Sequence, residues 1–214
     1  MGKYNKGILG AFSGKVGTVI GSSWNGIDYM RSLPRPSSKA PSDAQLIHRA
    51  KFGLVNGFLG PVSSLVNIGY KSLATKKTGY NVAIAEMMSD AITGIYPDFE
   101  IDYTKIFFSK GSLTGVYGVL AASTTAGEID ITWADNSDSG TAKATDKAVV
   151  LIYNPAKSVF VYNLDNGALR SAATDTIILP AEFSGDEVQV WIGFMTPDKK
   201  TFSTSIHAGQ IVVA

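Results

Sequence analysis

The second half of the chain is a series of short apolar runs separated by turn residues, and this pattern restricts the fold more than any other feature. Turns are supplied by Asn166-Gly167, Ser184-Gly185-Asp186 and Pro197-Asp198. The runs between them are TGVYGVLA, EIDITWA, KAVVLIYN, SVFVYNL, DTIILP, EVQVWIGFM, TFSTSI and QIVVA. Seven or more short strands with turn signals every 8–12 residues or so are typical of an antiparallel sandwich. We therefore predict an antiparallel β-sandwich over residues 99–214.

A helical pattern precedes these strands. Ser42 stands three residues before Gln45, which is a capping-box pattern. Apolar residues then recur at helical spacing: Leu46, Ile47, Ala50, Leu54, Val55 and Phe58. Gly60-Pro61 predicts a break, after which VSSLVNIGYKSLA predicts a second helical stretch. A third pattern runs from about Thr78 to Thr93, with Gly94 at the position that follows a helix.

The segment PRPSSKAPSD, residues 34–43, is rich in proline and serine and predicts an extended linker. The chain is therefore expected to have an α+β fold in three segments. Residues 1–41 are a glycine-rich arm, a β-hairpin and the linker, residues 42–98 are helical, and residues 99–214 form the sandwich.

The stretch GILGAFSGKVGTVIGSSWNGIDYMRS, residues 7–32, is similar to a phosphate-binding loop but lacks its spacing. Three residues separate Gly10 from Gly14 where that loop has four, and Val16 follows Lys15 where Ser or Thr is needed. A helix with this many glycines is also disfavoured, because each glycine costs about 1 kcal/mol relative to alanine. Strand-like runs on either side of Asn25-Gly26 instead predict a β-hairpin, since both turn residues of a type I′ turn need φ > 0.

The glycines before this hairpin indicate a flexible arm, and they allow another backbone to approach closely. An arm of this kind can add a strand to a neighbouring sheet. The residues expected to take part in assembly are Gly7, Gly10, Gly14, Lys15, Gly17, Trp24, Asn25, Gly26, Tyr29 and Arg31.

Charge is distributed unevenly along the chain. Residues 1–80 hold eleven Lys and Arg against Asp28 and Asp43, a net charge of +9, whereas residues 81–214 carry −8. Such asymmetry indicates a partner. Three explanations stay open: a basic face folded over an acidic face of the same molecule, contact between chains, and contact with a polyanion such as nucleic acid.

Several function classes lack support in the residues. The sequence has no cysteine, so disulfides and thiol chemistry are excluded. No uninterrupted apolar run approaches the length of about 20 residues that a membrane span needs, and no signal peptide is recognised. We expect a cytoplasmic protein before assembly, in a virion or extracellular assembly afterwards. His48 lies in a helical pattern and His207 lies near a C-terminal strand, and single histidines in such places are more often structural than catalytic. No G-x-S-x-G or HExxH motif is present.

The metal candidate is the segment DNSDSGTAKATD. Asp135, Ser137, Ser139 and Asp146 fall at positions 1, 3, 5 and 12 of an EF-hand loop. Position 12 is normally a bidentate Glu, position 9 is occupied by Lys143, and the flanking patterns are strands. An ordinary sandwich loop is the preferred interpretation, so we expect no metal, no cofactor and no small-molecule substrate.

Two resemblances extend this reading. GEIDITWADNSDSG and VQVWIGFMTPDKKTFSTS resemble strands of fibronectin type III domains, in which a tryptophan packs between the sheets. GKVGTVIGSSWNGIDYMRS, QLIHRAKF, SKGSLTG and ITWADNSDSGTAKATDKAVVLIYN resemble a family of small Bacteroidota proteins of unknown function, some of them from phage or prophage gene sets. The family has no known active site, so the resemblance implies no catalytic residues.

Three functions are weighed on this basis. The first is a structural subunit, joined to copies of itself or to other subunits through its arm and hairpin. The second is a nucleic-acid-binding virion component, because aromatic residues are interleaved with the cations of the basic half: Tyr4, Phe12, Trp24 and Tyr29. The third is a carbohydrate-active enzyme that stacks sugars on tryptophan. It is the weakest, because Trp133 and Trp191 lie in strand patterns that predict core positions. We expect the chain to be a structural subunit.

Overall fold

The computed structural model describes residues 2–4, 7, 10–24, 26–35 and 38–214. The chain divides into two compact units, Met1–Gln45 and Leu46–Ala214. We call them unit 1 and unit 2 and treat each by itself. The three segments expected from the sequence thus become two units, because the helical segment belongs to the same unit as the strands that follow it.

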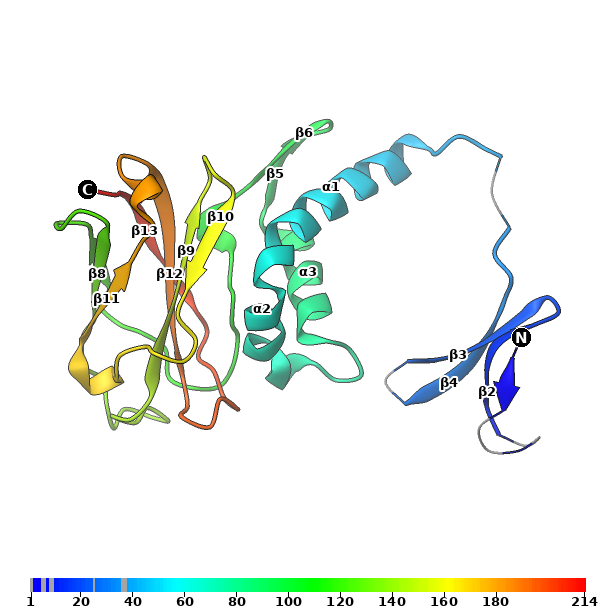
Figure 1. The fold of residues 1–214 in the computed structure, drawn as a ribbon, viewed down its shortest axis with the longest axis horizontal. Helices are drawn as coiled ribbons and strands as arrows, with labels where there is room; N and C mark the ends of the chain where they lie inside the picture. The colour runs from blue at the N-terminus through cyan, green and yellow to red at the C-terminus, as the bar shows by residue number, and fades with distance from the viewer. Residues whose placement is uncertain (1, 5–6, 8–9, 25, 36–37) are drawn as a thin grey trace. The chain divides into compact units, whose positions relative to one another are not determined.

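Unit 1 is an antiparallel sheet, here called the ribbon. Its described strands are β1 (Lys3–Tyr4), β2 (Phe12–Val16), β3 (Val19–Trp24) and β4 (Ile27–Ser32), hydrogen-bonded in that order (Figure 1). The predicted hairpin is confirmed: β3 pairs with β4 up to Trp24 opposite Ile27, and Gly26 has a φ of +79°. Asn25 lies outside the described residues.

The prediction of a flexible arm before this hairpin is wrong for residues 12–14, which belong to β2. The run KVGTVIGSSW, residues 15–24, predicts one strand, but it contains a second turn at Gly17-Thr18, where Gly17 has a φ of +59°. Val16 pairs with Val19 across this turn, and Gly14 pairs with Gly21. Two consecutive hairpins therefore replace an arm and one hairpin.

Unit 2 begins with helices. They are α1 (Asp43–Leu59), a 3₁₀ turn (Gly60–Val62), α2 (Ser63–Gly69), a second 3₁₀ turn (Lys71–Leu73) and α3 (Gly79–Asp90). The Gln45 side chain accepts a hydrogen bond from the Ser42 backbone N–H at 3.2 Å, as the capping-box pattern predicts. The predicted break at Gly60-Pro61 is confirmed.

The third helix ends earlier than predicted. Gly94 does not follow the helix but lies in β5 (Ile92–Ile95), with a φ of +83°. β5 pairs with β6 (Asp98–Ile101), and a 3₁₀ turn follows (Tyr103–Lys105). A Cβ on Gly94 would collide with the Asp98 carbonyl oxygen, so this glycine allows the tight approach of the two strands.

The sandwich consists of two antiparallel sheets within residues 120–212. One sheet has the order β10-β9-β12-β13, and the other has the order β11-β8-β7. The strands are β7 (Leu120–Ala122), β8 (Glu128–Thr132), β9 (Lys147–Asn154), β10 (Val159–Tyr162), β11 (Thr174–Ile178), β12 (Glu187–Met195) and β13 (Ile206–Val212). Short 3₁₀ turns stand at Arg170–Ala172 and Ala181–Phe183. The predicted α+β fold with an antiparallel sandwich is confirmed.

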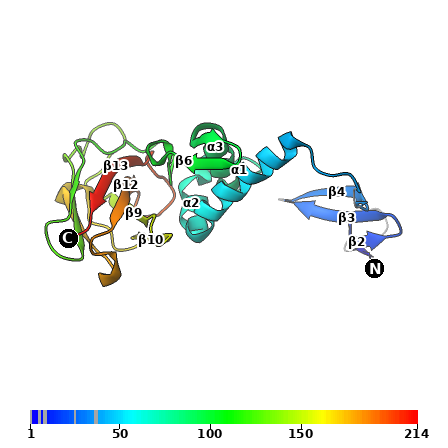
Figure 2. The ribbon, with the colours of Figure 1, turned by 90° about the horizontal axis from the view of Figure 1, so that it is seen from above.

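The helices cover the outer face of the four-stranded sheet (Figures 1 and 2). Successive side chains of a strand point to opposite faces. Val150 and Ile192 belong to the core between the two sheets, whereas Leu151 and Trp191 belong to the core shared with the helices. Because β9 and β12 are buried on both faces, their sequences are continuous apolar runs rather than alternating ones.

Both tryptophans of unit 2 are core residues, as predicted. Trp133 packs between the sheets, with its ring edge-on to Phe194 at a centroid distance of 5.6 Å. Trp191 is fully buried on the helical side, and its indole N–H donates to the Tyr103 carbonyl at 3.2 Å.

Among the described residues, one helical stretch has the length and apolar composition to cross a membrane. It is Asp43–Gly69, whose most apolar window has a mean hydropathy of 1.2 and is 39% buried inside the protein. Core helices of soluble proteins meet the same criterion, so this is weak evidence for a span. Val55, Leu59 and Leu65 of this stretch are buried in the core of unit 2.

Candidate assembly surface

The ribbon exposes most of its apolar side chains. In the described part of unit 1, Gly21 is the one buried residue. Trp24 is 51% exposed and Met30 is 71% exposed. Five further large apolar residues of the ribbon and its exit are also exposed: Val16, Val19, Ile27, Tyr29 and Leu33. A small sheet needs a covered hydrophobic face for stability, and this sheet does not cover its own.

The strand register places four of the predicted assembly residues on one face. Ile20 of β3 is paired with Lys15 on one side and with Arg31 on the other, so these three side chains form one row. Further along the hairpin, Ser22 pairs with Tyr29, and Trp24 pairs with Ile27. Because every second side chain of a strand points to the same side, these rows lie on one face of the ribbon. We call it the Trp24 face, and its residues are Lys15, Ile20, Trp24, Ile27, Tyr29 and Arg31.

The opposite face is partly covered by the ribbon itself. A Cβ on Gly21 would collide with the carbonyl oxygen and ring of Phe12, so the backbone at Phe12 crosses directly over Gly21. A hollow of about 300 Å³ lies beside this crossing, lined by Gly10, Ala11, Phe12, Asp28, Tyr29 and Met30. The close backbone approach expected of the glycines thus occurs within the chain, at a glycine that the assembly prediction did not include.

The predicted assembly glycines have turn positions. A Cβ at Gly7, Gly17 or Gly26 would meet no atom within 4 Å, but all three have a positive φ. Their shared requirement is therefore backbone conformation rather than close packing. Gly10 donates its N–H to the Gly7 carbonyl at 3.1 Å, and Gly14 has a φ of +100° within β2.

β4 is an edge strand in the described sheet. It pairs with β3 on one side, and all six of its residues are exposed. The unpaired N–H and C=O groups of such an edge are a template for another strand. The edge and the Trp24 face are adjacent, since β4 carries Ile27, Tyr29 and Arg31.

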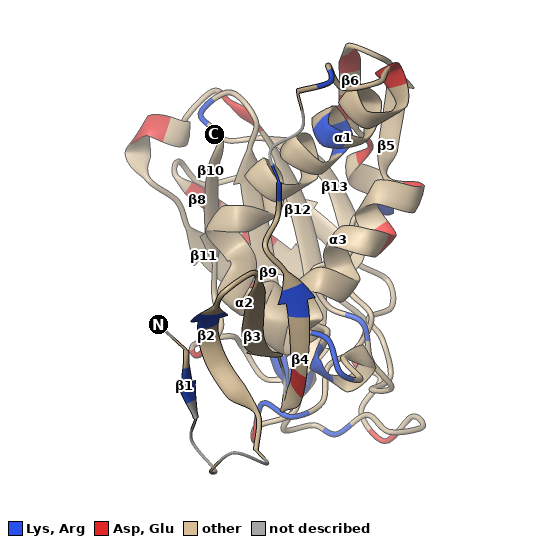
Figure 3. Cartoon of the chain, turned by 90° about the vertical axis from the view of Figure 1, so that its right-hand side faces the viewer, with Lys and Arg blue, Asp and Glu red and all other residues tan. Residues whose placement is uncertain are grey.

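Basic residues lie on β1, β2 and β4 of the ribbon (Figure 3). Within the described residues, neither Lys15 nor Arg31 forms an ion pair. The net charges of the two units differ by less than the net charges of the two sequence halves. Unit 1 holds six Lys and Arg against two Asp, which gives +4, and unit 2 carries the remaining −3 of the chain's +1. The difference arises because five cations of the basic half belong to unit 2. Arg49 and Lys51 lie on α1, Lys71 lies in a 3₁₀ turn, and Lys76 and Lys77 lie in the loop before α3.

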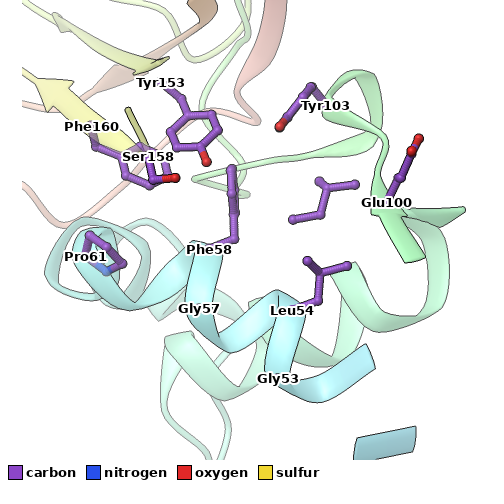
Figure 4. A pocket seen from close by; sticks show the side chains of 11 residues that line it. Gly53, Leu54, Gly57, Phe58, Pro61, Glu100, Tyr103, Tyr153, Ser158 and Phe160 are labelled. Atoms are coloured by element: carbon purple, nitrogen blue, oxygen red, sulfur yellow. The ribbon is translucent and has the colours of Figure 1, made fainter. Parts of the chain in front are cut away.

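Unit 2 has a separate feature, an open pocket of about 550 Å³ beside α1 that the sequence did not predict (Figure 4). We call it the aromatic pocket. It is lined by Gly53, Leu54, Gly57, Phe58, Pro61, Glu100, Ile101, Tyr103, Tyr153, Ser158 and Phe160. Its wall is formed by four rings, those of Phe58, Tyr103, Tyr153 and Phe160. The ring centroid of Tyr153 lies 4.4 Å from that of Phe160, 5.0 Å from that of Phe58 and 5.8 Å from that of Tyr103. The wall comes from four separate segments, and no local spacing in the sequence marks it.

The polar groups of this pocket are free for a partner. In Figure 4 the hydroxyl of Tyr103 points toward Tyr153, and the hydroxyl of Tyr153 points toward Phe58. Neither hydroxyl has a hydrogen-bond partner among the described residues. Burial raises the pKa of Tyr103, with smaller contributions from Tyr153 and Glu100, so this phenol is neutral at physiological pH. Glu100 lies at the edge of the pocket and is exposed.

The candidate calcium residues do not form a ligand set. Asp135 Oδ1 accepts from the Ser137 backbone N–H at 2.9 Å in a local turn. Asp146 is fully buried and forms an ion pair with Arg170, with Oδ2 and Nη2 3.1 Å apart. Ser139 contributes its carbonyl to the Thr114 hydroxyl at 3.0 Å. The described residues contain no group of three or more His, Asp or Glu placed to hold a metal ion.

The histidines lie in different environments. His48 is exposed on α1, whereas His207 of β13 lies beside Trp191, with 5.3 Å between ring centroids. His207 Nε2 is 2.8 Å from Gln189 Oε1, and burial lowers the pKa of this imidazole.

Comparison with known families decides the classification, since one family model matches residues 11–209. The chain belongs to the family of unknown function DUF6266. The match includes β2, β3 and β4, so the ribbon is part of the DUF6266 sequence. Among curated proteins, none matches the chain.

Solved structures similar to this DUF6266 chain include fibronectin type III domains. The domain of the human collagen alpha-1(XX) chain has 16% identity and a TM-score of 0.34, covering 50% of this chain and 93% of that one. A domain of human contactin 1 has 10% identity and a TM-score of 0.31, covering 50% and 83%. A structure of titin kinase with its flanking domains has 15% identity and a TM-score of 0.33, covering 47% and 16%.

Proposed function

We propose that this DUF6266 protein is a non-enzymatic structural subunit that self-assembles through its ribbon into a virion, a filament or a surface assembly. The observation that carries the proposal is the Trp24 face, an exposed group of large apolar side chains beside an unpaired strand edge. Exposed apolar groups of this kind mark interaction sites. The same surface carries Lys15, Trp24, Tyr29 and Arg31 of the predicted assembly residues.

The energetic argument favours a partner for the ribbon. Fully burying one large apolar side chain contributes about 1.5–3 kcal/mol. Trp24, Ile27 and Tyr29 lie in neighbouring rows, so covering this face buries them together. A strand added to the β4 edge would satisfy its free backbone groups at the same time. Contact between a ribbon and a different surface of the next copy is heterologous, and such contacts make rings or filaments.

Size measurement of the full-length protein tests the proposal. We expect the wild type to form oligomers in light scattering at micromolar concentration, with regular particles in negative-stain microscopy. Replacing both Trp24 and Tyr29 by serine removes the apolar surface and is expected to leave a folded monomer. The control is Tyr117→Ser, which changes a 60% exposed tyrosine of unit 2. A wild type that stays monomeric at all concentrations, or a double variant that assembles normally, contradicts the proposal.

A second candidate function is binding of single-stranded nucleic acid. It is favoured by the placement of Trp24 and Tyr29 on the same face as Lys15 and Arg31. Aromatic residues that stack bases contribute about 1–3 kcal/mol each, and flanking cations contact phosphates. Fluorescence anisotropy with a labelled oligonucleotide at roughly 150 mM salt separates the two functions. Tight binding without self-association would favour the nucleic-acid function over assembly.

A further inference from the structure

We infer that the aromatic pocket of unit 2 receives the Trp24 face of a second copy of the chain. This inference rests on the proposed function and names the receptor for the ribbon. A ribbon that inserts into a pocket of the next copy uses two different surfaces, so each copy donates once and accepts once.

The pocket matches an aromatic anchor in size and in lining. Its volume of about 550 Å³ lies within the range of specific binding pockets, about 300–1,000 Å³. Phe58, Tyr153 and Phe160 line the pocket with mutually packed rings, of which Phe58 is 7% and Tyr153 is 9% exposed. Trp24 stands at the end of β3, next to the turn, and is 51% exposed. Tryptophan is among the residues enriched at interface hot spots, which lie in well-packed, desolvated pockets.

Hydrogen-bonding groups on the two sides also correspond. Within the described residues, the Trp24 indole N–H has no acceptor, and the Tyr103 and Tyr153 hydroxyls have no partner. An indole N–H is a donor, and a phenol oxygen accepts. Tryptophan that is buried at an interface usually finds such a partner. An indole in the pocket therefore satisfies groups that are unpaired in the separate units.

Charge complementarity fixes the orientation. Lys15 and Arg31 lie in one row of the Trp24 face, and neither forms an ion pair among the described residues. Glu100 at the edge of the pocket and Asp98 on the same strand likewise form none there. The neighbouring Asp102 is already 3.4 Å from Lys105, and the Lys51 ammonium lies over the Phe99 ring at 5.1 Å. Two cations of the ribbon are thus matched by one carboxylate at the edge of the pocket and a second on the same strand.

The floor of the pocket gives a variant that blocks it without damaging the fold. Gly53 and Gly57 line it from α1, and a Cβ at either position would meet no atom within 4 Å. Gly57→Leu fills the pocket, and in a helix leucine is favoured over glycine by nearly 1 kcal/mol. The matched control is Ala85→Leu, at an exposed position of α3 outside the pocket.

Mixing two full-length variants tests the inference. Gly57→Leu has an intact ribbon and a blocked pocket, and Trp24→Ala has an intact pocket and a truncated ribbon. We expect each to be monomeric alone in light scattering, and an equimolar mixture to form a 1:1 dimer that grows no further. Ala85→Leu is expected to assemble as the wild type does. Thermal unfolding of Gly57→Leu confirms that unit 2 is intact.

The other outcomes overturn the inference in distinguishable ways. Normal assembly of Gly57→Leu, with loss of assembly in Trp24→Ala, removes the pocket as receptor but leaves the ribbon as the connector. Loss in both variants without recovery in the mixture shows that the ribbon of one copy does not enter the pocket of another. A monomeric wild type removes the inference and the proposed function together.

A charge reversal gives an independent measurement if Gly57→Leu fails to fold. Glu100 is exposed, so Glu100→Lys is expected to leave unit 2 folded and to weaken association about tenfold. Reversal of Lys15 and Arg31 to Glu is expected to weaken it similarly. A chain with all three substitutions should associate again, because the complementary charges are re-formed between copies. Unchanged association of Glu100→Lys, or no recovery in the triple variant, overturns the inference.

Discussion

Asp146 Oδ2 lies 3.1 Å from Arg170 Nη2, and both side chains are inaccessible to solvent. The same guanidinium donates to Asn136 Oδ1 at 2.6 Å and to the Thr114 carbonyl at 3.0 Å, and it stacks on the Phe194 ring at 3.7 Å. One buried cation thus joins loops that are far apart in the sequence at the Trp133 end of the sandwich. Its partner Asp146 belongs to the loop in which the sequence indicated a calcium candidate.

Removing the carboxylate of this pair should be severely destabilising. In Asp146→Ala the Arg170 guanidinium stays buried without its counter-charge, and losses of this kind are about 3–5 kcal/mol. The free energy of unfolding from urea denaturation measures the effect. Lys200→Ala is the control, because Lys200 is 77% exposed and lies 3.5 Å from Asp198. A surface pair of this type is worth at most about 1 kcal/mol. Similar losses in the two variants would contradict the structural role assigned to the buried pair.

The sequence predicted the parts of the fold that depend on local spacing. The capping box at Ser42, the break at Gly60-Pro61 and the hairpin at Asn25-Gly26 are set by residues within one turn of each other, and the structure shows each element. The other predicted runs of the sandwich contain its strands for the same reason, but TFSTSI, residues 201–206, forms no strand before Ile206. The turn at Gly17-Thr18 was missed because Thr18 is a good strand residue and the apolar run continues through it.

Features that join distant residues were not predictable in this way. Asp146 and Arg170 are separated by 24 positions, and the walls of the aromatic pocket come from α1, β9, β10 and the segment after β6. One signal indicated that helices cover the outer face of the four-stranded sheet. Apolar and polar residues do not alternate in KAVVLIYN and EVQVWIGFM, which is typical of strands buried on both faces. The sequence indicated that Lys15, Trp24, Tyr29 and Arg31 take part in assembly. That they lie on one face of the ribbon depends on how β2, β3 and β4 pair, and this pairing is set by the turn at Gly17-Thr18.

The helices and the sandwich should unfold together. Leu65 of α2 is fully buried in the core that also contains Leu151 of β9 and Trp191 of β12. Leu65→Ala leaves a cavity there, and such substitutions cost about 2–5 kcal/mol. We expect the helical circular dichroism and the tryptophan fluorescence to lose stability by the same amount, at one common midpoint. Two separated transitions, with the fluorescence unaffected, would show that the helices are an independent domain.

Stability should decline below neutral pH because of His207. Burial lowers the pKa of this imidazole in the folded protein, and the nearby Asp102 opposes that shift only in part. The unfolded state therefore takes up a proton first, near the ordinary value of about 6.5. The contribution is present in full above that pH and is lost as the pH falls through the lower folded pKa. Urea denaturation between pH 8 and pH 5 should show this slope in the wild type and in His48→Gln, but a smaller one in His207→Gln. An equal slope in His207→Gln would exclude the imidazole as its source.

The crossing of the chain at Gly21 gives a test of the ribbon that leaves the aromatic pocket unchanged. A Cβ at this position would collide with the Phe12 carbonyl oxygen, which belongs to the backbone and cannot rotate away. Gly21→Ala should therefore detach β2 from β3, beginning at Phe12, while β3 and β4 keep their own turn. Hydrogen exchange of the β2 amides is expected to accelerate at least about tenfold, since protection reports local opening.

Thermal unfolding of unit 2 should be unchanged in this variant, because Gly21 lies in the separate unit 1. Gly115→Ala is the matched control, since a Cβ there meets no atom within 4 Å and the φ is not positive. If exchange in β2 is as slow in Gly21→Ala as in the wild type, the crossing does not hold the ribbon together. If exchange accelerates and assembly is lost as well, the rigid ribbon and not merely its exposed side chains is needed for contact between copies.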